Sequence, residues 1–349
     1  MPSPLHTPLC DVLGIEHPVL SVGMAAGAGA ELAAAVSTAG GFGVLGASGM
    51  KPERLRAEVE RARSLTERPF GINLIIDTDD PEPDREFFRG QIAAAGAAGA
   101  KAVVLFWGEP APLVDAARAA GLVVLIQVGS AEEASTAAAA GVDAVIAQGV
   151  EAGGHVRATR SLWEVLPETV GAVAPLPVLA SGGIGDGAGI ARALRLGAHG
   201  VSLGTRFIAS TEANAHPEYQ RRVVASSAAD TVYTEDLYDV GWPNAPHRTL
   251  RNGTYEEWVA AGRPPPGQRP GEGTVIGRRR LTSGDYVEWP RYAVGVATRD
   301  FDGDFDHAPL WAGESCSVVT DVKPAAEIVA ELVRDAEAAL AQPAAVAKD

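Results

Sequence analysis

A histidine on a glycine-rich segment is the residue of this chain best suited to proton transfer. His155 ends the segment 148–155, which follows the short apolar run 144–147. A run of this length and composition predicts a buried strand, so His155 lies on a loop beyond the carboxyl end of that strand. Catalytic side chains of α/β proteins gather at this end of the strands. Because histidine titrates near neutral pH, we expect His155 to act as a general acid or base, with activity following one ionisation in that range.

Two further glycine-containing loops follow at the spacing of one strand–helix unit each. The first contains Ser181, Gly182 and Gly183, and the second contains Gly204 and Thr205. Glycines let backbone N–H groups approach an anion, and the N-terminus of the following helix adds partial positive charge. We therefore expect a phosphate-bearing ligand at these loops. Tight helix–strand packing is the alternative explanation for the glycine pair.

Other predicted strands also end in residues that could line a ligand site. These residues are Met24, Asn73, Gln127 and Gln148. One such residue is common in any loop, but the repetition over six loops indicates a shared site. Glu151 either orients His155 or is a solvated loop charge, and the sequence leaves both alternatives open.

The elements that must position these residues alternate regularly up to about residue 225. Predicted strands cover residues 18–22, 43–45, 70–74, 102–106, 123–127, 144–147, 178–180 and 200–203. Predicted helices cover residues 30–39, 52–64, 85–98, 111–120, 131–140, 162–172 and 187–196, with a last one at 324–341. Eight strand–helix units make an α/β fold of the (β/α)8 TIM-barrel type the simplest solution. The competing doubly wound sheet lacks its early Gly-x-Gly-x-x-Gly and acidic ribose ligand.

The alternation stops after strand eight. Between residues 229 and 311 there is little periodicity, whereas Trp, Tyr, Pro and Gly are plentiful. We interpret this region as an irregular insertion on the catalytic face that forms a lid or substrate subdomain. The predicted domains are therefore a barrel of residues 1–228 and 312–349 and an inserted region of residues 229–311.

Composition excludes several classes of partner. The formal net charge of −15 disfavours nucleic acid, whose backbone attracts a positive surface. Cys10 and Cys316 lie at opposite ends without metal-ligand spacing, which favours a reducing, cytoplasmic compartment over a disulfide. The sequence shows no signal peptide and no membrane-spanning stretch. A homodimer is compatible with the sequence, which does not decide the oligomeric state.

Taken in order, these motifs resemble the nitronate monooxygenase family, formerly called 2-nitropropane dioxygenases. They also resemble its relatives, the FMN-dependent enoyl-acyl-carrier-protein reductases. The resemblance covers about residues 10–225 and 308–340, with one motif per strand–helix unit. The matching segments are 18–24, 32–46, 71–74, 141–144, 148–155, 181–186, 204–207 and 310–313.

The resemblance implies a barrel that holds FMN non-covalently. His155 would be the catalytic base or acid facing the flavin, and Gly153 would lie along the flavin. The implied contacts to the isoalloxazine and ribityl chain are the backbone near Met24, and Asn73, Gln127 and Gln148. The implied phosphate contacts are Ser181, Gly182, Gly183, Gly204 and Thr205. No metal is implied.

The implied activity is oxidation of alkyl nitronates with O2 to a carbonyl product and nitrite, without NAD(P)H. The alternatives are an NAD(P)H-dependent FMN reductase of an enoyl thioester or quinone, a flavin monooxygenase of specialised metabolism, and a non-catalytic flavin-binding protein. Gln127 favours the monooxygenases over relatives with Lys at that position. Val156 and Arg157 depart from the family's Gly-Gly-His-Arg-Gly pattern and leave the binding protein open.

Overall fold

Eight parallel strands form the centre of the protein in a computed structural model that describes residues 4–77, 81–281 and 285–342. Their order is β1-β9-β8-β6-β5-β4-β3-β2, and a parallel bridge between Leu20 and Phe42 joins the two ends into a barrel. The predicted TIM barrel is therefore confirmed, with every predicted strand at its expected place. The strands are β1 (Val19–Ser21), β2 (Gly43–Gly46), β3 (Phe70–Ile75), β4 (Ala102–Phe106), β5 (Val123–Val128), β6 (Ala144–Gln148), β8 (Val178–Ser181) and β9 (Gly200–Leu203).

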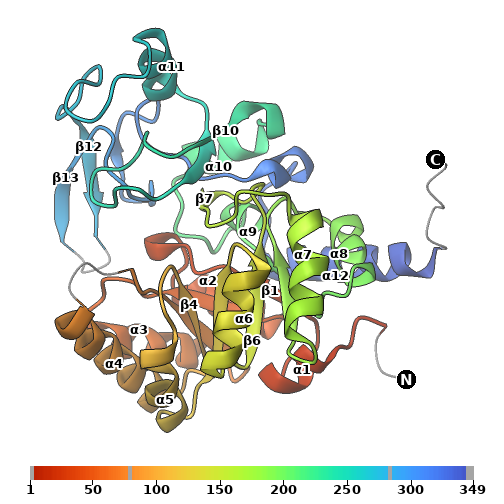
Figure 1. Ribbon diagram of the computed structural model, residues 1–349. Helices are drawn as coiled ribbons and strands as arrows, with labels where there is room; N and C mark the ends of the chain where they lie inside the picture. The colour runs from red at the N-terminus through yellow and green to blue at the C-terminus, as the bar shows by residue number, and fades with distance from the viewer. Residues whose placement is uncertain (1–3, 78–80, 282–284, 343–349) are drawn as a thin grey trace.

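Helices cover the outside of the barrel, as Figure 1 shows. Several of them end where a glycine takes up a left-handed conformation, such as Gly141 with a φ of 88° after α6. The short helix α1 (Pro8–Leu13) instead packs Leu9 and Leu13 against residues inside the barrel, such as Leu20. The outer helices are α2 (Ala30–Thr38), α3 (Pro52–Leu65), α4 (Pro81–Ala97), α5 (Ala111–Ala119), α6 (Ala131–Ala140), α7 (Leu162–Val173), α8 (Gly187–Arg195) and α12 (Ala325–Ala341).

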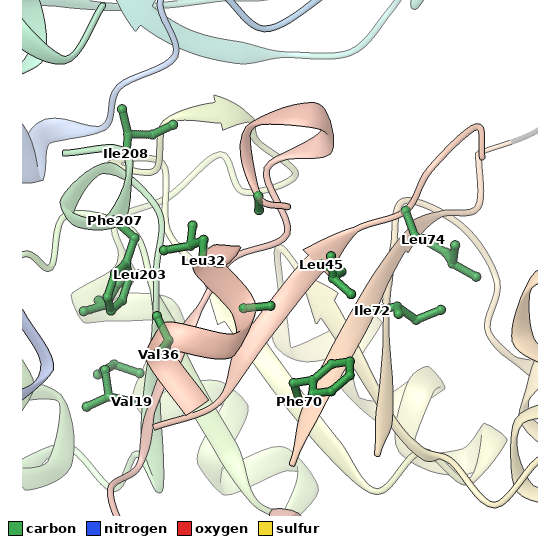
Figure 2. Packing of buried hydrophobic residues seen from close by; sticks show 14 of the residues in the cluster. Val19, Leu32, Val36, Leu45, Phe70, Ile72, Leu74, Leu203, Phe207 and Ile208 are labelled. Atoms are coloured by element: carbon green, nitrogen blue, oxygen red, sulfur yellow. The ribbon is translucent and has the colours of Figure 1, made fainter. Parts of the chain in front are cut away.

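The core has two layers because neighbouring strand residues point to opposite faces. Leu20 of β1 belongs to the cluster inside the barrel, whereas Val19 packs outward towards the helices. Figure 2 shows the outer layer, in which Val36 of α2 lies beside Val19 of β1, while Leu45 and Ile72 extend the layer on β2 and β3. Both layers are apolar, so side chains pack the interior of the barrel as well as the space between the strands and the helices.

The region between β9 and α12 holds short elements on the end of the barrel where β7 lies (Figure 1). It forms the three-stranded sheet β13-β12-β14 and contributes β10 and β11 to a second sheet, ordered β10-β11-β7, whose third strand comes from the loop after β6. The sequence predicted little regular structure here, and the short strands are a difference from that expectation. The remaining elements are η1 (Ala25–Gly27), β7 (Gly154–His155), α9 (Thr205–Ile208), α10 (Pro217–Val224), η2 (Ala228–Asp230), β10 (Thr231–Thr234), β11 (His247–Leu250), α11 (Gly253–Ala260), β12 (Val275–Arg280), β13 (Tyr286–Pro290), β14 (Asp302–Gly303) and η3 (Glu314–Val318).

Two features bear on the expected surroundings of the protein. Within the described residues, no helix combines the length and apolar character needed to cross a membrane. Cys10 and Cys316 are buried free thiols and form no disulfide with each other.

Candidate active site

One large cavity opens at the carboxyl ends of the barrel strands. It contains about 1230 Å³ of space, counting the part that is open to solvent. Every residue that the sequence singled out lines this cavity. These residues are Met24, Asn73, Gln127, Gln148, Gly153, His155, Ser181, Gly182, Gly183, Gly204 and Thr205.

Gln148 fixes the loop that carries His155. Its amide nitrogen donates to the His155 carbonyl oxygen over 3.0 Å, and its amide oxygen accepts from the Arg157 N–H over 2.8 Å. Gln148 is the last residue of β6, so the loop is tied directly to the barrel. Both amide atoms are thus used within the protein, although the side chain also lines the cavity.

The region after β9 holds the same loop from the other side. The backbone of β11 pairs with β7, which places His247 opposite His155 and Arg248 opposite Gly154. The buried guanidinium of Arg248 donates from Nε and Nη2 to the Val150 carbonyl oxygen over 3.1 and 2.9 Å. Burial in a low dielectric lowers the pKa of Arg248. The catalytic loop is therefore a strand of a small sheet and is fixed on both sides.

Gly153 is a glycine because two backbone segments meet there. A Cβ at this position would come within 2.3 Å of the Gly313 nitrogen. The approach is secured by the Glu314 N–H, which donates to the Glu151 carbonyl oxygen over 2.9 Å. The Gly313 N–H in turn donates to Thr205 Oγ1 over 2.9 Å. These contacts connect the His155 loop to the loop after β9.

Glu151 follows neither of the two alternatives that the sequence left open. Its Oε2 accepts from the Leu162 N–H over 2.9 Å, and its Oε1 accepts from the Ser161 hydroxyl. The carboxylate therefore binds the exposed donors at the start of α7, where negative charge is favourable. It does not orient His155.

The His155 imidazole is enclosed by other rings. The ring centroid of Trp242 lies 3.9 Å away, and those of Trp311 and His247 lie 5.4 and 5.7 Å away. Nε2 of His155 is buried, and no described group forms a hydrogen bond with it. Burial first, and then the nearby His247, lower the pKa of His155 to about 3. This burial argues against the expected ionisation near neutral pH, and the sequence contains no sign of the enclosure.

His247 is held as a neutral ring of one tautomer. Its Nε2 accepts from the Tyr238 N–H over 3.1 Å, so Nδ1, 2.9 Å from the Ala245 carbonyl oxygen, carries the proton. Burial lowers the pKa of His247. The ring of His247 packs beside that of His155.

The glycine pair after β8 presents free backbone donors. Gly182 and Gly183 have φ angles of 105° and 69°, which side chains rarely adopt. No described group accepts a hydrogen bond from either backbone N–H. A Cβ at Gly183 would also lie 3.0 Å from the Cβ of Glu151. The loop thus offers unsatisfied donors to a cavity occupant, as an anion site requires.

On the side of the cavity formed by β3 and β5, some polar side-chain atoms form hydrogen bonds within the protein and others do not. Asn73 Nδ2 donates to the Val104 carbonyl oxygen over 3.0 Å, which leaves its amide oxygen available. The Gln127 amide forms no hydrogen bond with any residue in the described ranges. Beside Met24, Ala25 has a φ of 45°, an uncommon conformation for a residue with a side chain. This wall can therefore accept and donate hydrogen bonds to a planar ligand.

Three aromatic residues of the site were missed from the sequence. Trp242 and Trp311 line the cavity, and their indole Nε1 atoms donate over 2.6 Å to Asp77 Oδ2 and the Gly295 carbonyl oxygen. Tyr219, which also lines the cavity, donates its hydroxyl hydrogen bond to the Trp311 carbonyl oxygen. The abundance of Trp and Tyr between residues 229 and 311 was the available signal for Trp242 and Trp311, but it gave no positions. Tyr219 lies in α10, before that region.

Comparison with known proteins identifies what this chain is similar to. The sequence profile of the family described as nitronate monooxygenase matches residues 6–335. A nitronate monooxygenase from Pseudomonas aeruginosa is 31% identical and covers 93% of this chain and 97% of its own. A (3aS,4S,5R,7aS)-5-hydroxy-7a-methyl-1-oxo-octahydro-1H-indene-4-carboxyl-CoA dehydrogenase from Mycobacterium tuberculosis is 34% identical over 74% of this chain and 70% of its own. Among solved structures, FabK from Thermotoga maritima matches with a TM-score of 0.76 and 29% identity, covering 96% of this chain and 97% of its own.

Proposed function

Because the chain belongs to the nitronate monooxygenase family, we propose that it binds FMN in this cavity and oxidises alkyl nitronates with O2. The products are a carbonyl compound and nitrite. One observation carries the proposal: free backbone donors and an unpartnered imidazole face the same cavity from neighbouring loops. The chain is an oxidoreductase by its family, and FMN is the cofactor that we assign to it.

The residues that line the cavity fit the parts of FMN. Gly182 and Gly183 would hold the phosphate through their backbone N–H groups, with Ser181, Gly204 and Thr205 beside them. A second nucleotide motif, which FAD would need, is absent from the sequence. The contacts proposed for the isoalloxazine and ribityl chain are Met24, Asn73, Gln127, Gln148 and Gly153.

The protein's own contribution is to move one proton and to exclude water. When bound, the flavin supplies the oxidation of the nitronate and the reaction with O2. His155 lines the cavity with an unpartnered Nε2, which would accept a proton from the α-carbon of a neutral nitroalkane. Trp242 and Trp311 keep this nitrogen away from bulk solvent.

The proposal also covers the arrangement and location of the protein. Residues 229–311 form the wall of the substrate site, since they contribute Trp242 and Trp311, while residues 1–228 and 312–349 form the barrel. The substrate is a small molecule, and O2 is the second substrate. We place the enzyme in the cytoplasm on the basis of its two free cysteines. A homodimer stays a prediction.

A second candidate is an NAD(P)H-dependent flavin reductase of an enoyl thioester or quinone. It is favoured by the similarity to FabK and to the dehydrogenase of a carboxyl-CoA compound. In that reaction His155 would donate a proton instead of accepting one.

An anaerobic assay separates the two functions. We expect a nitronate to reduce the bound flavin without NAD(P)H. Flavin bleached by NAD(P)H, with no response to a nitronate, would establish the reductase and reject the monooxygenase. Acid release followed by chromatography identifies the cofactor, and recovery of FAD in place of FMN would contradict the assignment.

A further inference from the structure

Four rings surround the His155 imidazole, and three of them belong to fixed parts of the protein. Trp107 is buried directly after β4, and its ring centroid lies 6.3 Å from that of His155. His247 belongs to β11, which pairs with β7. Trp311 donates from its indole Nε1 to a backbone carbonyl oxygen over 2.6 Å. The fourth ring, that of Trp242, is not fixed in this way.

Trp242 lies on a short segment that is anchored only at its ends. Val240 forms a β-bridge, and the Pro246 carbonyl oxygen accepts a hydrogen bond over 2.7 Å from the backbone of the loop that carries His155. Within the described chain, the backbone of residues 241–244 forms hydrogen bonds only inside its own turn. The segment can therefore move between two fixed points.

Both ends of this segment have backbone conformations that suit a hinge. Gly241 and Asn244 have φ angles of 96° and 56°, in the left-handed region that glycine and asparagine tolerate best. Gly241, Pro243 and Asn244 are exposed, so Trp242 is the residue of the segment that contacts the interior. A change of φ and ψ at the two ends would swing the indole without disturbing the anchors.

One polar contact holds the indole in place. Trp242 Nε1 donates over 2.6 Å to Oδ2 of Asp77, an exposed residue two positions after β3. Asp77 does not line the cavity, so it acts on the site through Trp242. A hydrogen bond to a charged acceptor is strong, but water competes for it at the surface, and the contact can therefore break and re-form.

While this contact is formed, the base cannot meet its substrate. Nε2 of His155 is buried, and the ring centroid of Trp242 lies 3.9 Å from that of the imidazole. A base must come within about 2.6–3.2 Å of the atom that gives up the proton. The substrate can reach Nε2 only after a covering ring has moved, and Trp242 is the ring that can move.

We propose that residues 241–244 form a lid, in which Trp242 leaves His155 to admit the substrate and Asp77 is the positioning residue that holds the lid closed. The inference rests on the function proposed above, because it assumes that the substrate reaches Nε2. It adds the step that controls this access.

The test measures how fast His155 of the FMN-loaded protein reacts with diethyl pyrocarbonate, which acylates accessible neutral imidazoles. Peptide mass spectrometry gives the rate, and the exposed His6 is the internal reference. In the parent, His155 should react at least about tenfold more slowly than His6. Asp77→Ala should raise the rate at His155 about tenfold and leave that at His6 unchanged. Asp77→Asn keeps an acceptor oxygen and should stay close to the parent.

Two further variants test whether Asp77 acts through Trp242. Trp242→Phe keeps a ring but cannot donate the hydrogen bond, so it should also raise the rate at His155. Combining it with Asp77→Ala should give no further increase, since both changes remove the same bond. Glu109→Gln is the matched control, because Glu109 is an exposed carboxylate on the loop after β4 that forms no hydrogen bond with any described residue. This control should keep the parent rate.

Three results would overturn the lid and leave the proposed function standing. They are equal rates at His155 in the parent and Asp77→Ala, a parent rate as fast as that at His6, and increases that multiply in the double variant. If the rates are as expected but the parent oxidises no nitronate, the proposed function is rejected and the lid is kept.

Discussion

Opening the aromatic enclosure of His155 should move its titration into the measurable pH range. The perturbation is Trp242→Ala, which removes the ring stacked 3.9 Å from the imidazole. Burial is the larger cause of the lowered pKa of His155, and the neighbouring His247 is the smaller. Removing Trp242 lets water reach the imidazole and leaves His247 in place, so the pKa should rise only part of the way to its ordinary value.

The size of the effect follows from the lowered pKa. A pKa reduced from 6.5 to about 3 corresponds to roughly 5 kcal/mol against the imidazolium, at about 1.4 kcal/mol per pKa unit. Trp242 is the closest of the surrounding rings, so its loss should return at least about one unit. The neutral imidazole is the base, and activity is therefore lost as the pH falls through the pKa of the folded protein.

The assay is the pH dependence of kcat/KM for a freshly dissolved neutral nitroalkane. The parent enzyme should give a flat profile down to about pH 5, and Trp242→Ala should lose activity at a pH at least about one unit higher than the parent does. Trp163→Ala is the matched control. Trp163 lies on α7, where its ring packs against Arg192 of α8, and it does not line the cavity. This variant should keep the parent profile. An inflection near pH 6.5 in the parent, absent from His155→Gln, would refute the argument from burial.

Three further predictions concern the cofactor, the base and the loop. Gly183→Val should weaken FMN binding at least about tenfold while the circular dichroism spectrum stays unchanged. A side chain is strained at the Gly183 φ of 69° and blocks the free N–H. Parental FMN affinity would contradict the assignment of this loop to the phosphate. His155→Ala should lower turnover of neutral nitroalkane by about 10²–10⁴-fold and that of preformed nitronate far less, at unchanged FMN content, whereas equal losses would reassign His155 to binding. Arg248→Met should lower kcat about tenfold in FMN-loaded protein, because it releases the Val150 carbonyl oxygen. Arg248→Lys should have the same low kcat, since lysine cannot donate the same pair of hydrogen bonds. If either variant keeps parental kcat, Arg248 does not position the loop.

The barrel could be predicted because its signals are local. Each strand is a short apolar run, and several helices are followed by glycines such as Gly99 and Gly141, which have positive φ angles in the structure. The polar residues that follow the strands meet because parallel strands end at one edge, whatever the details of packing. The fold and the position of the cavity therefore follow from patterns within about thirty residues of chain.

The electrostatic state of the site could not be predicted because its causes are distant in sequence. Trp242, Trp311 and His247 surround His155, yet all three lie in or at the end of the aperiodic region. Glu151 was ambiguous for another reason: its partners, Ser161 and Leu162, are close in sequence, but no residue pattern indicates that the carboxylate turns towards the start of α7. A pattern that shows where a histidine lies along the chain does not show what covers it.

The region after β9 is more than a cover for the cavity. Its strand β11 pairs with β7, its Arg248 holds the Val150 carbonyl, and its Trp242 stacks on the imidazole. Each contact acts on the segment that carries His155, and none of them involves the glycine pair after β8. Changes in this region should therefore alter the position and ionisation of the base before they alter FMN binding. Exchange of the region between relatives would change substrate preference and proton transfer together, because the same residues form the substrate wall and fix the catalytic loop.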